Sequence, residues 1–290
     1  MTRILLFTRP LYLFLTALTY SIGLGIARYL GMTLRVDLQI LAGVVLVLLV
    51  AASGLLTAAF RPFNELLVPG ETKHERDILR RRLLAFGVGC MGVAGMLIFF
   101  LRRAELIQLD DALMLALFAG VALANALPPA RLSNRGFGEL ADAFLIASFA
   151  PTIAFFLQVG SFHRLLTLFT FPLFLIFLAC FLALDFPAYA EDLKYQRRSL
   201  LTSLTWQQAI PIHRLLMIAA YAVLALTPFL GVSFGLVWPV LLTAPLAAYQ
   251  IFMLYNISNG AMPLWAVFKL LALAIMGLTA YLMLMAFWLS

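Results

Sequence analysis

The sequence predicts an all-α membrane protein with about nine transmembrane helices. Hydrophobic residues make up 64% of its 290 positions and charged residues only 11%, and the mean hydropathy is +1.03. A soluble domain would carry roughly a quarter charged residues, because it must cover itself with solvated groups. Apolar runs recur at about the 20-residue length that crosses a ~30 Å hydrocarbon layer. The period-two alternation typical of a membrane barrel is absent from the sequence.

Nine apolar runs define the expected spans: 10–30, 38–60, 83–101, 112–127, 139–159, 164–184, 211–231, 235–256 and 264–288. The first run has no small-residue cleavage site at signal-peptide length, so we expect an uncleaved span. Both cysteines, Cys90 and Cys180, fall inside apolar runs and are expected to be small core residues. We expect one transmembrane domain over residues 1–290.

The distribution of Lys and Arg predicts how the chain is oriented. Three polar segments, 61–82, 128–138 and 185–210, should share one face with the N-terminus, and that face carries 14 of the 20 Lys and Arg residues against 5 on the other. The positive-inside rule places this face in the cytoplasm, in a multi-pass protein of the cell membrane. The same bias accounts for the net charge of +7, so no nucleic-acid partner is expected.

The polar segment after the sixth span begins Asp185-Phe-Pro-Ala-Tyr-Ala-Glu-Asp192 and continues to Lys194, Arg197 and Arg198. Residues seven apart share one face of a helix. Two carboxylates on that face suit Mg²⁺, which takes one or two carboxylates plus substrate phosphates, and the cations would bind phosphate oxygens. Alternatively, Asp185 caps the next helix and the basic run is simply solvated.

The segment after the second span offers a second group of oxygen ligands. Asn64, Glu65 and Glu71 are donors that a hard cation such as Mg²⁺ prefers. Thr72 and Glu75 instead have the spacing of a capping box at the start of the third long helix. This helix-capping role explains Glu75 well and leaves Glu65 and Glu71 as candidate ligands.

The segment from Asn125 to Glu139 combines a Pro-Pro pair and a Gly-Phe-Gly turn with two cations, Arg131 and Arg135. Both cations stand beside the start of the helix that carries Glu139. Taken alone, this segment is an ordinary connection between two helices.

Together, the three segments resemble the UbiA superfamily of intramembrane prenyltransferases, over nearly the whole chain. The opening Thr8-Arg9-Pro10 resembles the family's first span, and residues 185–200 resemble its second Asp-rich motif, usually Asp-x-Pro-Asp-x-x-x-Asp. Residues 128–139, with Pro151 and Gln158-Val-Gly160, resemble the 1,4-dihydroxy-2-naphthoate polyprenyltransferase branch.

The chain departs from the family pattern in both Asp-rich motifs. Aligned on Asn64 and Glu65, the first motif has Val68 and Thr72 where aspartates belong. The central aspartate of the second motif is Ala188. These losses affect the expected metal ligands and leave the expected helical fold unchanged.

The resemblance implies a UbiA-like helical bundle that transfers a polyprenyl group from its diphosphate to an aromatic, quinone-precursor-like acceptor, with Mg²⁺ as cofactor. An alternative is a non-catalytic descendant that binds a prenyl lipid, quinone or tetrapyrrole, or that serves as a structural subunit of a membrane complex. The enzyme role implies catalytic and metal-binding roles for Asp185 and Asp192, metal-binding roles for Glu65 and Glu71, and substrate-binding roles for Asn64, Arg131, Glu139, Lys194 and Arg198. At least one of the three donors in the 61–82 segment should then line the same cavity as Asp185 and Asp192.

Overall fold

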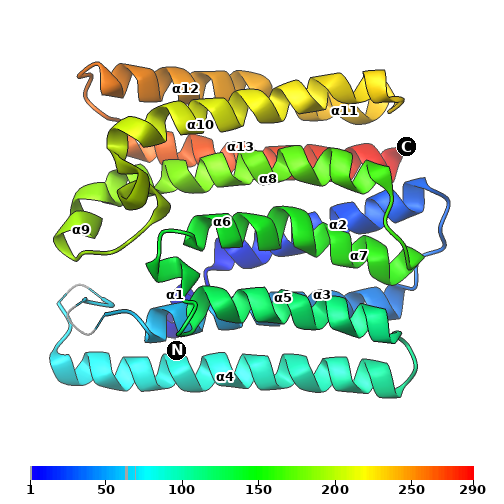
Figure 1. The fold of residues 1–290 in the computed structure, drawn as a ribbon, viewed down its shortest axis with the longest axis horizontal. Helices are drawn as coiled ribbons and strands as arrows, with labels where there is room; N and C mark the ends of the chain where they lie inside the picture. The colour runs from blue at the N-terminus through cyan, green and yellow to red at the C-terminus, as the bar shows by residue number, and fades with distance from the viewer. Residues whose placement is uncertain (1, 63–64, 69) are drawn as a thin grey trace.

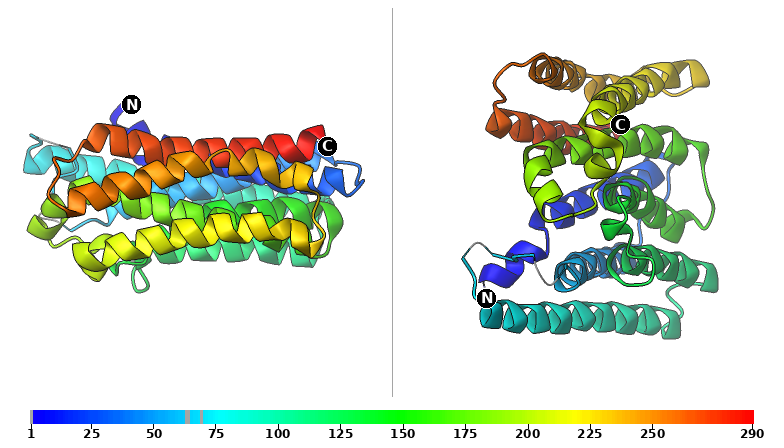
Figure 2. Two further views of the ribbon diagram at one scale, coloured as in Figure 1. Left: turned by 90° about the horizontal axis from the view of Figure 1, so that it is seen from above. Right: turned by 60° about the vertical axis from the view of Figure 1, so that its left-hand side comes forward.

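The computed structural model describes residues 2–62, 65–68 and 70–290. Over these residues the chain is helical without strands, and nine of its helical segments are long and apolar enough to cross a membrane. The helices lie side by side along one axis (Figures 1 and 2). In chain order they are α1 (Thr2–Phe7), α2 (Pro10–Tyr29), α3 (Val36–Ala59), α4 (Lys73–Arg103), α5 (Leu109–Ala126), η1 (Leu132–Asn134), α6 (Gly138–Ala143), η2 (Phe144–Phe149), α7 (Ala150–Val159), α8 (Arg164–Asp185), η3 (Phe186–Ala188), α9 (Tyr189–Lys194), α10 (Leu200–Leu226), η4 (Thr227–Leu230), α11 (Phe234–Leu241), α12 (Ala244–Ser258) and α13 (Trp265–Leu289).

Two of the helices begin about ten residues earlier than the apolar runs predict. Helix α4 begins at Lys73 because Thr72 and Glu75 form the predicted capping box. The helical stretch α10 begins at Leu200, where Ser199 and Thr202 form a second capping box, and it is kinked at Thr205, whose φ is +67°. A hydropathy pattern detects only the apolar part of a helix, so it misses charged turns at the helix end that extend into water. The polar connections are therefore shorter than the predicted segments 61–82 and 185–210.

The fifth span, Gly138–Val159, contains a turn of π-helix at Phe144–Phe149. This turn lies directly before Pro151, at the start of α7. Proline has no amide hydrogen, and its ring clashes with the carbonyl four residues earlier in a regular α-helix. The wider π turn accommodates the proline while the span continues.

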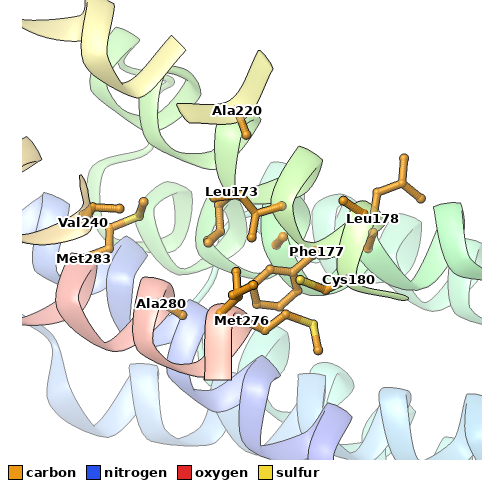
Figure 3. Close-up of a cluster of buried hydrophobic side chains, with 14 of the residues drawn as sticks. Leu173, Phe177, Leu178, Cys180, Ala220, Val240, Met276, Ala280 and Met283 are labelled. Carbon is orange, nitrogen blue, oxygen red and sulfur yellow. The ribbon is translucent and has the colours of Figure 1, made fainter. Parts of the chain in front are cut away.

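Helix α8 lies at the centre of the bundle. In its most apolar window 72% of the residues are buried, against 17% for α4, so α4 presents most of its surface to the surroundings. Figure 3 shows part of the cluster around α8, in which Phe177 and Cys180 lie beside Met276 of α13, and Val240 of α11 lies beside Met283. Cys180 is therefore a core residue, as the sequence predicts, and Cys90 is a half-buried free cysteine.

Helices α2 and α7 approach each other closely at Gly23. A Cβ atom added there would lie 2.1 Å from the carbonyl oxygen of Pro151, so this contact requires glycine. The close approach fixes the second half of α2 against α7, in the same span that carries Glu139 and Asp142.

All three polar segments meet at one end of the bundle (Figure 1). Helices α8 and α9 bring the 185–199 region there, α6 and η1 bring the 128–138 connection, and the connection between α3 and α4 completes the group. Residues of all three segments line one cavity there, and the side of the membrane that this end faces stays a prediction.

Candidate active site

A polar cavity of about 160 Å³ opens among these connections. It is bounded by the first turn of α2, the end of α3, the start of α6 and the end of α8. We call it the polar cavity. Its charged lining consists of five arginines and five carboxylates: Arg9, Arg61, Arg131, Arg197, Arg198, Glu65, Glu139, Asp142, Asp185 and Asp192.

Asp185 and Asp192 both line the polar cavity. Asp185 ends α8, and the short η3 turn followed by α9 returns Asp192 to the same cavity. The buried Oδ2 atom of Asp185 has no hydrogen-bond partner among the described residues. Its side chain makes no capping hydrogen bond to the following turn, which removes the support for the capping alternative.

Glu65 lies opposite, on the connection between α3 and α4, with 3% of its side chain exposed. It pairs with Arg61 at 3.3 Å and also with Arg197. Arg197 in turn lies 3.2 Å from Asp192, measured from Nη1 to Oδ1. One guanidinium therefore joins carboxylates that come from the two opposing connections.

The structure places Glu71 outside the polar cavity. Its carboxylate accepts a hydrogen bond of 2.7 Å from the Leu67 amide and lies 3.9 Å from Arg76, so it stabilises the fold of its own connection. Asn64 lies outside the described residues. Val68 borders a neighbouring pocket, and Thr72 caps α4.

Arg131 lines the cavity and donates a hydrogen bond to the carbonyl of Phe60 at the end of α3. The connection that carries it is held against α10 at Gly136, which has a φ of +82° and lies close to Ser203. Glu139 accepts a 3.0 Å hydrogen bond from the Leu200 amide, so it ties α6 to the start of α10.

The two remaining predicted cations differ in position. Arg198 is exposed and lines the cavity, and no ion pair to it occurs among the described residues. Lys194 does not line the cavity, and its ammonium group lies 5.5 Å from the centre of the Tyr195 ring.

Several cavity residues were absent from the predicted set, among them Arg9, Tyr12, Arg61, Asp142, Phe181 and Arg197. Arg9 forms an ion pair of 2.6 Å with Asp142, whose other oxygen accepts a 2.8 Å hydrogen bond from Asn125. Below them, the ring of Tyr12 stacks on Phe181 with centroids 4.9 Å apart. An arginine directly before the proline of the first span was the available sequence signal for this group.

Burial and neighbouring charges shift the pKa values of the arginines here. Burial lowers the pKa of Arg61 to about 10, and the nearby positive charge of Arg197 acts in the same direction. Burial also lowers the pKa of Arg197, but Glu65 and Asp192 outweigh it and raise the value. For Arg9, burial is likewise outweighed, mainly by Asp142, and the pKa rises. All three remain cationic at neutral pH.

Comparison with known proteins finds similar structures but no similar sequence. No protein-family model matches the sequence, and no curated protein matches it. Solved structures of a UbiA homolog from Archaeoglobus fulgidus do match: one has a TM-score of 0.57 at 14% identity. Those bound to DMAPP and Mg²⁺ and to GPP and Mg²⁺ have TM-scores of 0.54 and 0.55 at 15% identity. Each alignment covers 97% of this chain and 99% of the homolog.

The chain has a UbiA-type fold. The alignment extends over nearly the full length of both chains, so the similarity is not limited to one part of the bundle. At this level of identity the similarity concerns the fold, and the activity has to be argued from the polar cavity itself.

Within this UbiA fold, the polar cavity does not offer ligands for a pair of Mg²⁺ ions. Among the described residues, no three His, Cys, Asp or Glu side chains lie close enough together to hold a metal ion. Glu65 and Asp192 are already paired with Arg197. Mg²⁺ requires near-octahedral oxygen ligands at about 2.1 Å, and a guanidinium between two carboxylates occupies that space.

Proposed function

We propose that this chain is a membrane prenyltransferase that moves a polyprenyl group from its diphosphate to an aromatic, quinone-precursor-like acceptor. The polar cavity carries this proposal, because it places arginines at the mouth and an aromatic pair beneath them in a UbiA-type fold. The homologs bound to DMAPP and GPP, both prenyl diphosphates, support this substrate class. The naphthoate-type acceptor rests on the resemblance of residues 128–160.

The diphosphate would bind to the arginines at the cavity mouth. Arg198 has no ion pair among the described residues, and Arg131 uses one of its donors on a backbone carbonyl, which leaves others available. Guanidinium groups form short, charge-assisted hydrogen bonds to phosphate oxygens, often two at a time. Such donors stabilise the negative charge that develops on a departing diphosphate.

The prenyl group would react above the Tyr12 and Phe181 rings. The bond between its first carbon and the diphosphate oxygen breaks, and the electron pair leaves with the diphosphate. The stacked pair forms an apolar part of the cavity wall, with Arg9 over the Tyr12 ring, so it would keep water away from the allylic cation. The aromatic ring of the acceptor then forms the new carbon–carbon bond.

The acceptor carbon must then lose its proton to restore aromaticity. Asp185 would accept that proton, since its carboxyl group is buried, lines the polar cavity and lies beside that of Glu139. Glu139 also lines the cavity and is held in place by the Leu200 amide, so it would orient the acceptor. Asp192 would act through Arg197, to which it is bound.

The test is prenyl transfer by purified protein in detergent micelles, with GPP and longer prenyl diphosphates and a panel of naphthoate and benzoate acceptors. Diphosphate release and prenylated product are measured with Mg²⁺ and with EDTA. Replacing Asp185 by Asn should lower the rate by about 100-fold or more, the usual contribution of a general base. Its folding should be little changed, because Asn keeps the size of the side chain and removes a buried negative charge beside Glu139.

Asp37→Asn is the matched control, since Asp37 is an exposed carboxylate at the opposite end of the bundle. It should leave the rate unchanged. Equal loss of folding and activity in Asp185→Asn would assign Asp185 a structural role and refute the proton-acceptor role.

A second candidate is a non-catalytic UbiA-like protein that binds a prenyl lipid, quinone or tetrapyrrole, or that serves as a subunit of a membrane complex. The degenerate first motif favours it, because Thr72 caps a helix and Val68 borders another pocket where the family has aspartates. A folded protein that binds a prenyl diphosphate without releasing diphosphate from any donor would support this candidate.

A further inference from the structure

Arg197 has an unusual position at the junction of the two polar connections. It follows α9 after a turn at Gln196, whose φ is +52°, and its amide donates a 2.8 Å hydrogen bond to the Asp192 carbonyl. Directly after it, the Ser199 capping box starts α10. Backbone contacts before and after Arg197 therefore fix the position of its Cα atom.

The Arg197 guanidinium bridges two carboxylates that are almost completely buried. Only 3% of the Glu65 side chain and 6% of the Asp192 side chain are exposed. Two buried carboxylates facing each other would repel and would each lose their hydration, which is unfavourable without a cation between them. Arg197 supplies that cation, and Arg61 adds a second positive charge at Glu65.

We propose that the Arg197 guanidinium takes the place of a divalent metal ion, so that the polar cavity binds a prenyl diphosphate without metal. This inference rests on the proposed function for its ligand. A guanidinium has five N–H donors, and the two pairings with Glu65 and Asp192 leave others for a third, anionic partner. Because 35% of the Arg197 side chain is exposed, that remaining edge is accessible from the cavity.

The same geometry explains how the first Asp-rich motif lost its aspartates. A metal ion held between the connections needs several oxygen ligands, whereas an arginine bridge needs one carboxylate on each side. Glu65 and Asp192 provide these two carboxylates, so the bridge does not need aspartates at positions 68 and 72, where this chain has Val68 and Thr72.

The test is binding of GPP to the purified full chain, measured by isothermal titration calorimetry with EDTA and with Mg²⁺, together with Mn²⁺ binding measured by electron paramagnetic resonance. The wild-type protein should bind GPP equally in EDTA and Mg²⁺ and should bind no Mn²⁺ in the cavity. Arg197→Ala should lose about tenfold or more in GPP affinity in EDTA, the effect of one charge-assisted hydrogen bond. It should also gain Mn²⁺ binding, because Glu65 and Asp192 lose the cation that they share and Glu65 keeps only Arg61, and Mg²⁺ should restore part of its affinity for GPP.

Arg135→Ala is the matched control, because Arg135 is exposed at the same end of the bundle and does not line the cavity. It should change neither measurement. If Arg197→Ala does not fold, Arg197→Lys keeps the charge but cannot contact both carboxylates in the same way, and it should show a smaller loss of GPP affinity in EDTA.

The outcomes separate this inference from the proposed function. Wild-type protein that binds GPP only with Mg²⁺ would overturn the inference and leave the prenyltransferase proposal intact. Wild-type protein that binds no GPP in either buffer, while only Arg197→Ala binds Mn²⁺, would support Arg197 as the resident cation and refute the prenyl diphosphate ligand. Unchanged GPP and Mn²⁺ binding in Arg197→Ala would also overturn the inference.

Discussion

Asp142 is expected to be the most stabilising carboxylate at the polar cavity. It holds Arg9 at 2.6 Å and accepts a hydrogen bond from the almost completely buried Asn125. Asp142→Ala would leave a guanidinium without its partner and the Asn125 amide without its acceptor.

The magnitude follows from these two contacts. Removing one partner from a fully buried ion pair costs about 3–5 kcal/mol, and the 31% exposure of the Arg9 side chain reduces this to about 2 kcal/mol. An unsatisfied buried amide adds about 1–2 kcal/mol. We therefore expect Asp142→Ala to lower the free energy of unfolding by about 3–4 kcal/mol. Asp142→Asn should lower it by only about 2 kcal/mol, because it keeps an acceptor for Asn125.

The assay is equilibrium unfolding in mixed micelles with increasing SDS, followed by tryptophan fluorescence. The double variant Arg9→Leu/Asp142→Leu should be more stable than Asp142→Ala, because neither charge is then left buried and unpaired. A loss of less than about 0.5 kcal/mol in Asp142→Ala, the range of ordinary surface changes, would refute the assignment of this pair as a buried structural contact.

Two further predictions use the same unfolding assay. Gly23→Ala should lower the free energy of unfolding by about 1–3 kcal/mol or more, because its Cβ would collide with the Pro151 carbonyl; Gly89→Ala, where nothing lies within 4 Å, should be neutral or slightly stabilising, and similar losses in both variants would contradict the close helix contact. Thr72→Ala should remove the capping box of α4 and lower the free energy by about 1 kcal/mol. Hydrogen exchange should then accelerate in the first turn of α4, and unchanged exchange there would contradict the cap.

Much of the fold could be predicted from the sequence, because a bilayer imposes a length and an apolar composition on every span. All nine apolar runs correspond to observed helices. The ends of α4 and α10 were misjudged, because their first turns carry polar or charged residues. Local capping chemistry fixes those ends, and for α4 the box of Thr72 and Glu75 was readable in advance.

The site was predictable only where its residues belong to one local segment. The spacing of Asp185 and Asp192 brings both to the cavity, and the connection after the second span contributes Glu65. By contrast, Glu71 is turned away by contacts within its own connection, which spacing does not reveal.

The pairing of Arg9 with Asp142 joins residues 133 positions apart, so no local pattern could indicate it. The predicted set included Lys194 and Arg198 but not Arg197, which follows the positive-φ turn at Gln196. That turn brings Arg197 into the cavity and leaves Lys194 outside it.

The π turn at Phe144–Phe149 has a consequence for how this span can vary among related sequences. A π turn contains one residue more than the α-helical turn it replaces, and each residue of an α-helix rotates the chain by about 100°. Glu139 and Asp142 precede the turn, and the tightly packed Phe155 follows it. Because the extra residue is absorbed within the turn, deleting one residue between 144 and 149 should convert it into a regular α-helical turn and leave Glu139 and Asp142 in register with the residues after it. The ring of Pro151 would then meet the carbonyl four residues earlier, so the π turn and the proline depend on each other.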